Sequence, residues 1–418
     1  MTIKALYPNV RPTLNLDFAK TKALDPRITF TRASTATFVG ADGLIKTAAS
    51  GAPRFDHNPA TGESLGLLVE EARTNYLQPS VPDYSGGFGT WTNGLAPLSA
   101  NAGTAPDGTN TAVLTAWNTV SGGERMYYST GTPTSPGITE IHSFFVKPKT
   151  PGAGDKFVVT FQGANWSWLN GLSSTKLFYF DFDTQTLSAN TGTGYQTTVT
   201  ALANGWYRIS IPAVNNGVGG FNTYVAINRN VQVGNWYIWG CQRENGTFPT
   251  SYIPTVASTV TRAADVASMT GTNFSSWYRQ DEGSFLAKVK ALSPTFQQSI
   301  FRAKPASGTS EMRIHFSGSS ALSSIYSDAG SGSGGSTPTS IHLPYSTSFA
   351  AAYKLLDFAV VNATQVVTNT TGGVAISPVF TQAHIGSMAG QFLSGTIDRL
   401  TYYPVRLPNA QLQALTAT

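Results

Sequence analysis

Apolar and polar residues alternate along this chain over short stretches, with a period of two. Residues 156–161, 206–211 and 312–316 show the pattern and are rich in Val, Ile, Phe and Tyr, as half-buried strands are. Clusters of Gly, Pro, Asn and Ser interrupt it about every ten residues. Many short strands separated by turns predict a sandwich or barrel. The one segment with a helical pattern is residues 408–418, in which Leu412 and Leu415 would face inward.

The strand pattern divides the 418 residues into three regions. Residues 1–80 hold many turn formers and only a short apolar run at 65–69, too short for a core of its own. We expect this region to be an extended arm that packs on its own domains or on a neighbouring subunit. Residues 81–265 carry aromatic-rich strands, and residues 266–418 restart the pattern. The predicted fold is all-β, with two antiparallel jelly-roll β-sandwiches in tandem behind the arm.

The last strand of the second region, residues 235–241, reads Asn-Trp-Tyr-Ile-Trp-Gly-Cys. Bulky residues on both faces predict a central strand that is covered on both sides. We expect at least two of Trp206, Trp236 and Trp239 to be core residues, and Cys241 to be a small buried hydrophobe.

The amino-acid composition reduces the number of function classes that fit this chain. Charged residues make up 12% of the chain, against about 25% in an average soluble domain, and neutral polar residues replace them. Such a surface suits a protein that recognises neutral, hydroxyl-rich ligands outside a cell. The net charge of +5 includes no dense run of Lys or Arg, so we expect no nucleic-acid partner. No apolar run approaches the roughly 18 residues of a membrane span, so we expect no membrane partner either. The N-terminus does not read as a signal peptide, which indicates release by a route other than secretion.

Several segments resemble bacteriophage structural proteins. Three N-terminal segments are similar to a region shared by phage tail, fibre and head-associated proteins. They are residues 16–37, which include Thr-Phe-Thr-Arg-Ala-Ser-Thr, the segment Pro53-Arg-Phe-Asp-His57, and residues 66–75, Gly-Leu-Leu-Val-Glu-Glu-Ala-Arg-Thr-Asn. Residues 234–254 resemble the end of a carbohydrate-binding-module-like jelly roll. Residues 385–412 resemble the closing strands of laminin-G-like, concanavalin A-like sandwiches.

The resemblance implies a virion protein, assembled in the host cytoplasm, whose partners are other capsid or tail proteins. Residues 1–80 would then attach it to the virion. The family also implies a homo-oligomer, most simply a trimer.

Sugar binding needs flat aromatic side chains flanked by amide or carboxyl groups. The sequence offers two groups of candidates. The candidates are Trp166 and Trp168 with Asn165, Asn170 and Gln162, and, in the second group, Tyr127 and Tyr128 with Glu124 and Arg125. For the two tryptophans, the sequence favours core packing over sugar binding.

Enzyme chemistry has little support in the sequence. Asp181 and Asp183 would share one face of a strand, but the phrase reads as a strand that enters a turn. Glu70 and Glu71 are adjacent and would point to opposite faces. The five histidines show no metal-ligand spacing. We therefore expect no enzyme, no cofactor and no metal.

Asp357 and Asp398 are the candidates for a calcium site of the kind that some laminin-G-like domains hold.

The sequence thus predicts a phage virion protein, a fibre, spike or decoration, that displays glycan-binding sandwiches for host adhesion. Two alternatives stay open. One is a purely architectural capsid or tail component, and the other is a polysaccharide depolymerase.

Overall fold

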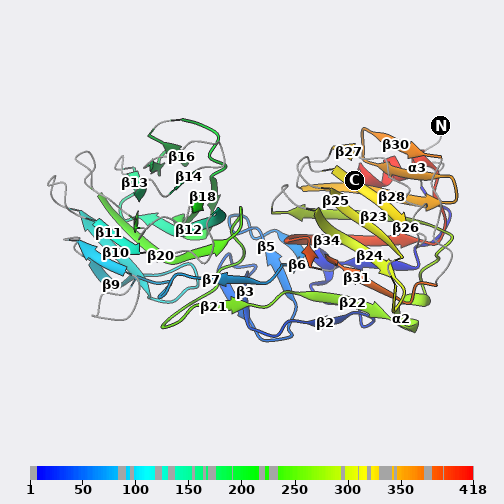
Figure 1. Cartoon of the computed structure of the whole chain (residues 1–418), viewed down its shortest axis with the longest axis horizontal. Helices are drawn as coiled ribbons and strands as arrows, with labels where there is room; N and C mark the ends of the chain where they lie inside the picture. Colours follow the sequence, from blue (N-terminus) through cyan, green and yellow to red (C-terminus); the bar gives the residue numbers. More distant parts are fainter. Residues whose placement is uncertain are drawn as a thin grey trace.

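The chain forms two antiparallel β-sandwiches that lie side by side and are joined by a narrower waist (Figure 1). The computed structural model describes residues 7–82, 91–94, 98–117, 125–129, 137–152, 156–162, 166–167, 176–190, 192–215, 222–225, 234–292, 297–308, 310–317, 322–328, 341–342, 346–370, 379–388 and 390–417. The prediction of an all-β protein built from antiparallel sandwiches is confirmed.

The first sandwich comes from the middle of the chain. In the described residues, one of its sheets contains β14 (Trp166–Ser167), β18 (Tyr207–Asn215), β12 (Ile138–Pro148), β20 (Gly234–Asn245), β10 (Ala112–Trp117) and β9 (Leu98–Gly103), with β17 (Thr198–Ala201) paired to β18. The opposite sheet contains β16 (Thr186–Ala189), β15 (Lys176–Asp181), β13 (Lys156–Gln162), β19 (Asn222–Val225), β11 (Arg125–Ser129) and β8 (Trp91–Gly94). Inward side chains of both sheets, among them Phe144, Phe161 and Ile209, form one core.

Strand β20 is central and covered on both faces, as its sequence predicts. It lies between β12 and β10. Trp236 and Cys241 belong to the core between the sheets, whereas Trp239 belongs to a second cluster on the outer face with Trp206 and Ile45. All three tryptophans are buried. Gly240 (φ 57°) lies where the pairing with β12 shifts, and this bulge returns Cys241 to the inner face.

The second sandwich combines strands from both ends of the chain. Its first sheet contains β30 (Val366–Asn369), β29 (Phe358–Val361), β28 (Ser346–Lys354), β23 (Glu282–Ala291), β34 (Gly395–Tyr403), β6 (Ser64–Val69) and β5 (Arg54–His57), with β1 (Leu14–Asp17) paired to β34. The other contains β2 (Thr29–Thr31), β22 (Val266–Thr270), β31 (Gln382–Ile385), β24 (Gln297–Lys304), β25 (Glu311–Ser317), β26 (Leu322–Asp328) and β27 (Ile341–His342).

The segment that the sequence predicts as an extended arm packs on its own chain. Strands β1, β2, β5 and β6 extend the two sheets of the second sandwich, and Leu16, Leu67 and Val69 enter its core. The physical reason is that strands of three to six residues cannot bury a core alone, so each completes an edge that the C-terminal strands leave open. In Figure 1 the blue strands β5 and β6 accordingly lie beside the red β34, and β2 lies beside the green β22.

Short ribbons and helices complete the molecule. The waist carries the ribbons β3 (Ala36–Val39) with β4 (Ile45–Ala48) and β7 (Arg73–Asn75) with β21 (Val260–Arg262), and β32 (Ser387–Met388) pairs with β33 (Gln391–Phe392). The helical segments are α1 (Phe18–Thr21), η2 (Ala203–Gly205), α2 (Thr272–Ser275) and α3 (Asn409–Thr416).

The predicted C-terminal helix is confirmed as α3, in which Leu412 is buried and Leu415 packs against the outer face of the first sheet. Among the described residues, no helix has the length and apolar character that crossing a membrane requires.

Candidate functional site

The aromatic candidates for sugar binding divide between the two sheets of the first sandwich. Trp166 lies in β14, opposite Asn215, at the edge of the sheet that contains β20. Gln162 lies in β13, and Arg125, Tyr127 and Tyr128 lie in β11, both in the opposite sheet. Trp168, Asn165, Asn170 and Glu124 lie outside the described residues. Sugar binding at these positions therefore stays a prediction.

The remaining acidic candidates have structural partners. Asp181 ends β15 and accepts the amide N–H groups of Asp183 and Thr184 at 3.0 Å each, which confirms the predicted turn. Asp357 accepts a hydrogen bond from Arg406 at 2.9 Å, and Asp398 lies 3.0 Å from the Lys288 ammonium. In the part of the chain that the structure describes, no group of three or more His, Cys, Asp or Glu could hold a metal ion.

The waist holds a buried group of charges that we call the waist cluster: Arg32, Arg54, Glu70, Arg262 and Asp265. All five side chains are at most 1% exposed. Arg54 contacts both acids, at 2.7 Å to Glu70 and 2.5 Å to Asp265. Arg262 binds Glu70 at 2.5 Å, and Arg32 binds Asp265 at 3.0 Å.

These residues come from β5, from the ends of β6 and β21 and from the segments beside them. The waist cluster therefore ties the N-terminal strands to the chain that connects the two sandwiches.

Glu70 has the fullest set of partners. Besides Arg54 and Arg262, it accepts hydrogen bonds from the amide and the hydroxyl of Ser251, at 2.7 Å each. Burial alone raises the pKa of a carboxyl group, but the two guanidinium groups and Ser251 outweigh burial and bring the pKa of Glu70 down to about 2. Glu70 is therefore ionised across the neutral range. Its amide N–H donates to Asp265 at 2.9 Å, which joins the two acids through the backbone.

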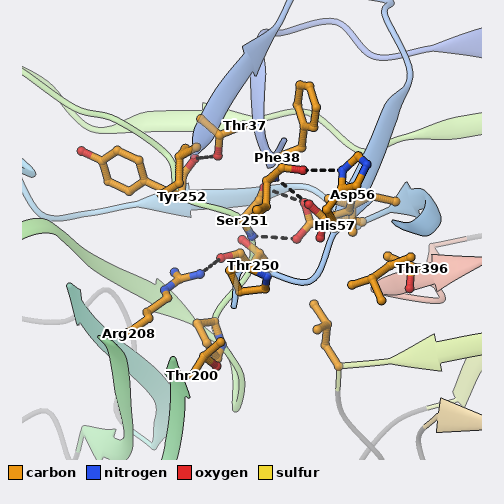
Figure 2. A pocket seen from close by; sticks show the side chains of 18 of the residues that line it. Thr37, Phe38, Asp56, His57, Thr200, Arg208, Thr250, Ser251, Tyr252 and Thr396 are labelled. Atoms are coloured by element: carbon orange, nitrogen blue, oxygen red, sulfur yellow. Dashed lines mark hydrogen bonds between the residues drawn. The ribbon is translucent and has the colours of Figure 1, made fainter. Parts of the chain in front are cut away.

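A cavity of about 210 Å³ adjoins the waist cluster and lies between the two sandwiches; we call it the waist cavity. Three parts of the chain line it. Phe38 comes from the waist, Phe145 and Arg208 come from the first sandwich, and Asp56, His57, Lys290, Leu292 and Thr396 come from the second. Figure 2 shows Thr396 across from Asp56 and His57, with Arg208 and Thr200 reaching in from the other sandwich.

Two successive residues of β5 line the same cavity, at the point where the pairing of β5 with β6 is bulged. Neighbours in a regular strand point to opposite faces, yet Asp56 and His57 both line the waist cavity. Asp56 pairs with Gly66 and His57 with Ser64, so that Leu65 is the extra residue of β6. Gly66 has φ 89°, and a Cβ there would lie 2.1 Å from the carbonyl oxygen of Ile397. Only glycine therefore permits this backbone approach.

Asp56 and Arg208 are the cavity's main charged groups. Burial raises the pKa of Asp56 to about 6, although the amide of Val39 donates to its Oδ1 at 2.7 Å. Arg208 donates to the Thr250 carbonyl at 2.7 Å and to the Ser143 hydroxyl at 3.0 Å, and it lies over the Phe145 ring. Burial lowers the pKa of Arg208, but a guanidinium stays charged in proteins. The second ring nitrogen of His57, Nε2, is buried without a hydrogen-bond partner among the described residues.

Sequence reasoning did not single out these residues as a site. Arg54, Asp56 and His57 stand together in Pro53-Arg-Phe-Asp-His57, and in the sequence Glu70 stands out only as half of an adjacent acidic pair. A usable signal was present. Charged residues are scarce in this chain, and several lie within its most motif-like segments, where ordinary surface charges would not gather.

No protein-family model matches this chain, and no curated protein matches it. Solved structures with similarity include three of the Trypanosoma rangeli sialidase. The complex with the inhibitor DANA is 12% identical and the match covers 62% of this chain and 50% of that chain. The complex with 2,3-difluorosialic acid, a covalent intermediate, is 11% identical and a further structure of the sialidase is 10% identical, and each match covers 93% of this chain and 77% of that chain. Each has a TM-score of 0.26. The first match thus spans half of the sialidase chain.

Because these structures are of enzymes, they contradict the sequence-based expectation that the chain is not an enzyme, and that expectation is withdrawn. At a TM-score of 0.26 the likeness assigns neither an activity nor a substrate to this chain.

Proposed function

We propose that this chain is a structural protein of a bacteriophage virion, a fibre, spike or decoration, whose two β-sandwiches bind glycans on the host surface. The observation that carries the proposal is the waist cluster. Its Arg32, Arg54 and Glu70 come from the three N-terminal segments that resemble phage proteins. Ser251, which donates to Glu70, comes from the segment that resembles a carbohydrate-binding-module-like jelly roll. The resemblance thus rests on residues that form one buried unit, not on scattered surface positions.

Composition and architecture support glycan binding in particular. The chain is poor in charge and rich in neutral polar residues, and its aromatic-rich strands build sandwiches. A shallow sugar site binds weakly, but several copies on one particle raise the effective concentration of sites at the host surface. A homo-oligomer, for which we favour a trimer, would supply this multivalency.

The proposal is tested by pull-down of the labelled, purified chain on candidate host cells, with soluble surface polysaccharide as competitor. Binding that the polysaccharide competes away is the expected result. Binding to capsid or tail proteins alone would replace the proposal by a purely architectural role. Release of reducing ends from the polysaccharide would identify a depolymerase instead.

The aromatic candidates are tested in the same assay. The double variant Trp166→Ala with Trp168→Ala should lose cell binding if these residues hold the sugar. Full binding by this variant would move the site elsewhere on the sandwiches.

A further inference from the structure

The waist cavity has the size of a single sugar ring. An engineered apolar cavity of about 150 Å³ binds benzene, a ring of six heavy atoms. The waist cavity, at about 210 Å³, has room for one pyranose ring with its hydroxyl groups. Its walls are mostly apolar, with Phe38, Phe145 and Leu65 among them, and a few polar groups converge on the space they enclose. This combination is typical of small-ligand sites.

The charges that line the cavity favour a neutral ligand. Among the described lining residues, Asp56 and Glu70 are acidic and Arg208 and Lys290 are basic. Glu70 is already paired with Arg54 and Arg262, and Lys290 is exposed, so Asp56 and Arg208 are the two less exposed charges that a ligand would meet, one of each sign. Hydroxyl groups can donate to a carboxylate and accept from a guanidinium, so a polyhydroxylated neutral molecule can use both.

Asp56 is placed to bind such a ligand. Its Oδ1 accepts the amide N–H of Val39, and the amide of His57 also hydrogen-bonds to the carboxylate. An ionised carboxylate has about four acceptor positions, so it can still accept from a ligand hydroxyl. Asp56 pairs with Gly66 beside the bulge of β6, and the Val39 amide holds its carboxylate in place. β-Bulges are common next to binding sites. The side chain therefore stands on a rigid strand, not on a loop.

We infer that the waist cavity binds one pyranose ring of a neutral saccharide, with Asp56 accepting hydrogen bonds from its hydroxyl groups. The inference rests on the proposed glycan-binding function and adds a site between the sandwiches, apart from the aromatic candidates in the first one. Both sandwiches line this site, so it exists only when they are docked.

Asp56 lowers the stability of the folded chain, as residues retained for binding often do. Burial raises its pKa to about 6, which means that the ionised form disfavours folding at neutral pH. Asparagine at this position would keep an acceptor for the Val39 amide and remove the charge. The variant Asp56→Asn should therefore bind sugar more weakly and melt at a higher temperature. A carboxylate with a purely structural role would lower the melting temperature when replaced.

The experiment titrates the full chain at pH 7 with D-glucose, D-galactose and N-acetylglucosamine by calorimetry, and measures retention of the same chain by soluble host polysaccharide. Asp56→Asn should weaken binding at least tenfold and raise Tm. The second variant, Leu292→Trp, should weaken binding similarly, because this side chain lines the cavity, is 42% exposed and would fill it. The matched control is Asp183→Asn, an exposed aspartate in the turn after β15, which should bind as the wild type does.

The outcomes separate the two proposals. If Asp56→Asn and Leu292→Trp both retain polysaccharide and monosaccharide binding, the cavity assignment falls and the glycan-binding function stands. If wild type binds no polysaccharide and no monosaccharide, both fall. A third outcome is that wild type binds the polysaccharide but no monosaccharide, and that both variants lose polysaccharide binding. The cavity would then hold one sugar unit of a longer glycan. A lower Tm of Asp56→Asn would make Asp56 structural and overturn the inference.

Discussion

The waist cluster offers the sharpest test of how this protein is held together. Replacing Glu70 by glutamine keeps the shape of the side chain and removes its charge. Arg262 would then lose its acidic partner, and Asp265, which pairs with Arg32 and Arg54, would be the single acid of the waist cluster. Removing one partner from a buried ion pair typically costs about 3–5 kcal/mol, because the remaining charge is left uncompensated.

A second route gives a similar magnitude. The pKa of Glu70 falls from 4.5 to about 2 in the folded chain, which corresponds to roughly 3 kcal/mol of stability at neutral pH. The sign follows from linkage. Because the folded-state pKa is the lower one, this stability is complete above about pH 4.5 and is lost as the pH falls toward 2. The difference between wild type and Glu70→Gln should therefore shrink in the same acidic window.

The assay is urea unfolding followed by tryptophan fluorescence, at pH 7 and at several acidic pH values. The neighbouring residue supplies the control: Glu71 pairs with Arg73 at 2.5 Å, but its side chain is 30% exposed. Glu71→Gln should cost less than about 1 kcal/mol, as partly exposed ion pairs do. Since a chain of two sandwiches can unfold in more than one step, the midpoint of the first transition is the quantity to compare. If the two variants lose equal stability, the reasoning about uncompensated buried charge is refuted.

Three further outcomes are expected. At pH 7, Asp56→Asn should raise the free energy of unfolding by up to about 3 kcal/mol, reduced by any solvent screening in the cavity, because the pKa of Asp56 is 3.8 in the unfolded chain and about 6 in the folded one. Unfolding at a series of pH values should show this gain vanish as the pH falls from about 6 to 3.8. A gain independent of pH would contradict this reasoning. Gly66→Ala should destabilise the chain by roughly 1–3 kcal/mol or more, since its Cβ would meet the Ile397 carbonyl, and a thermal melt equal to that of wild type would disprove the close approach. Leu356 is 54% exposed and has φ 59°, a left-handed conformation that costs a residue with a Cβ. Leu356→Gly should therefore raise the free energy of unfolding by about 1 kcal/mol in the same melt. A loss of stability would show that the side chain packs more than its exposure indicates.

Local patterns in the sequence were sufficient for the all-β class, for the C-terminal helix and for the two-sided burial of residues 235–241. Each depends on interactions between near neighbours: period-two alternation selects strands, Gly and Pro clusters end them, and a strand with bulky residues on both faces must be covered twice. The turn at Asp181 is local for the same reason, since its carboxylate binds amides two and three residues onward.

The site was beyond the reach of such patterns. Arg32 and Asp265 are separated by 233 positions, and Arg54 and Asp265 by 211, so nothing in either segment indicates its partner. Strands β1, β2, β5 and β6 show too little periodicity to assign them to a sheet, and their place was decided by the open edges of strands at the far end of the chain. The waist cavity exists only where the two sandwiches dock. The sequence by itself therefore determined which elements form, because that choice depends on neighbouring residues. Tertiary structure alone decided which charges meet and where a ligand could enter, because burial and pairing depend on contacts between segments hundreds of residues apart.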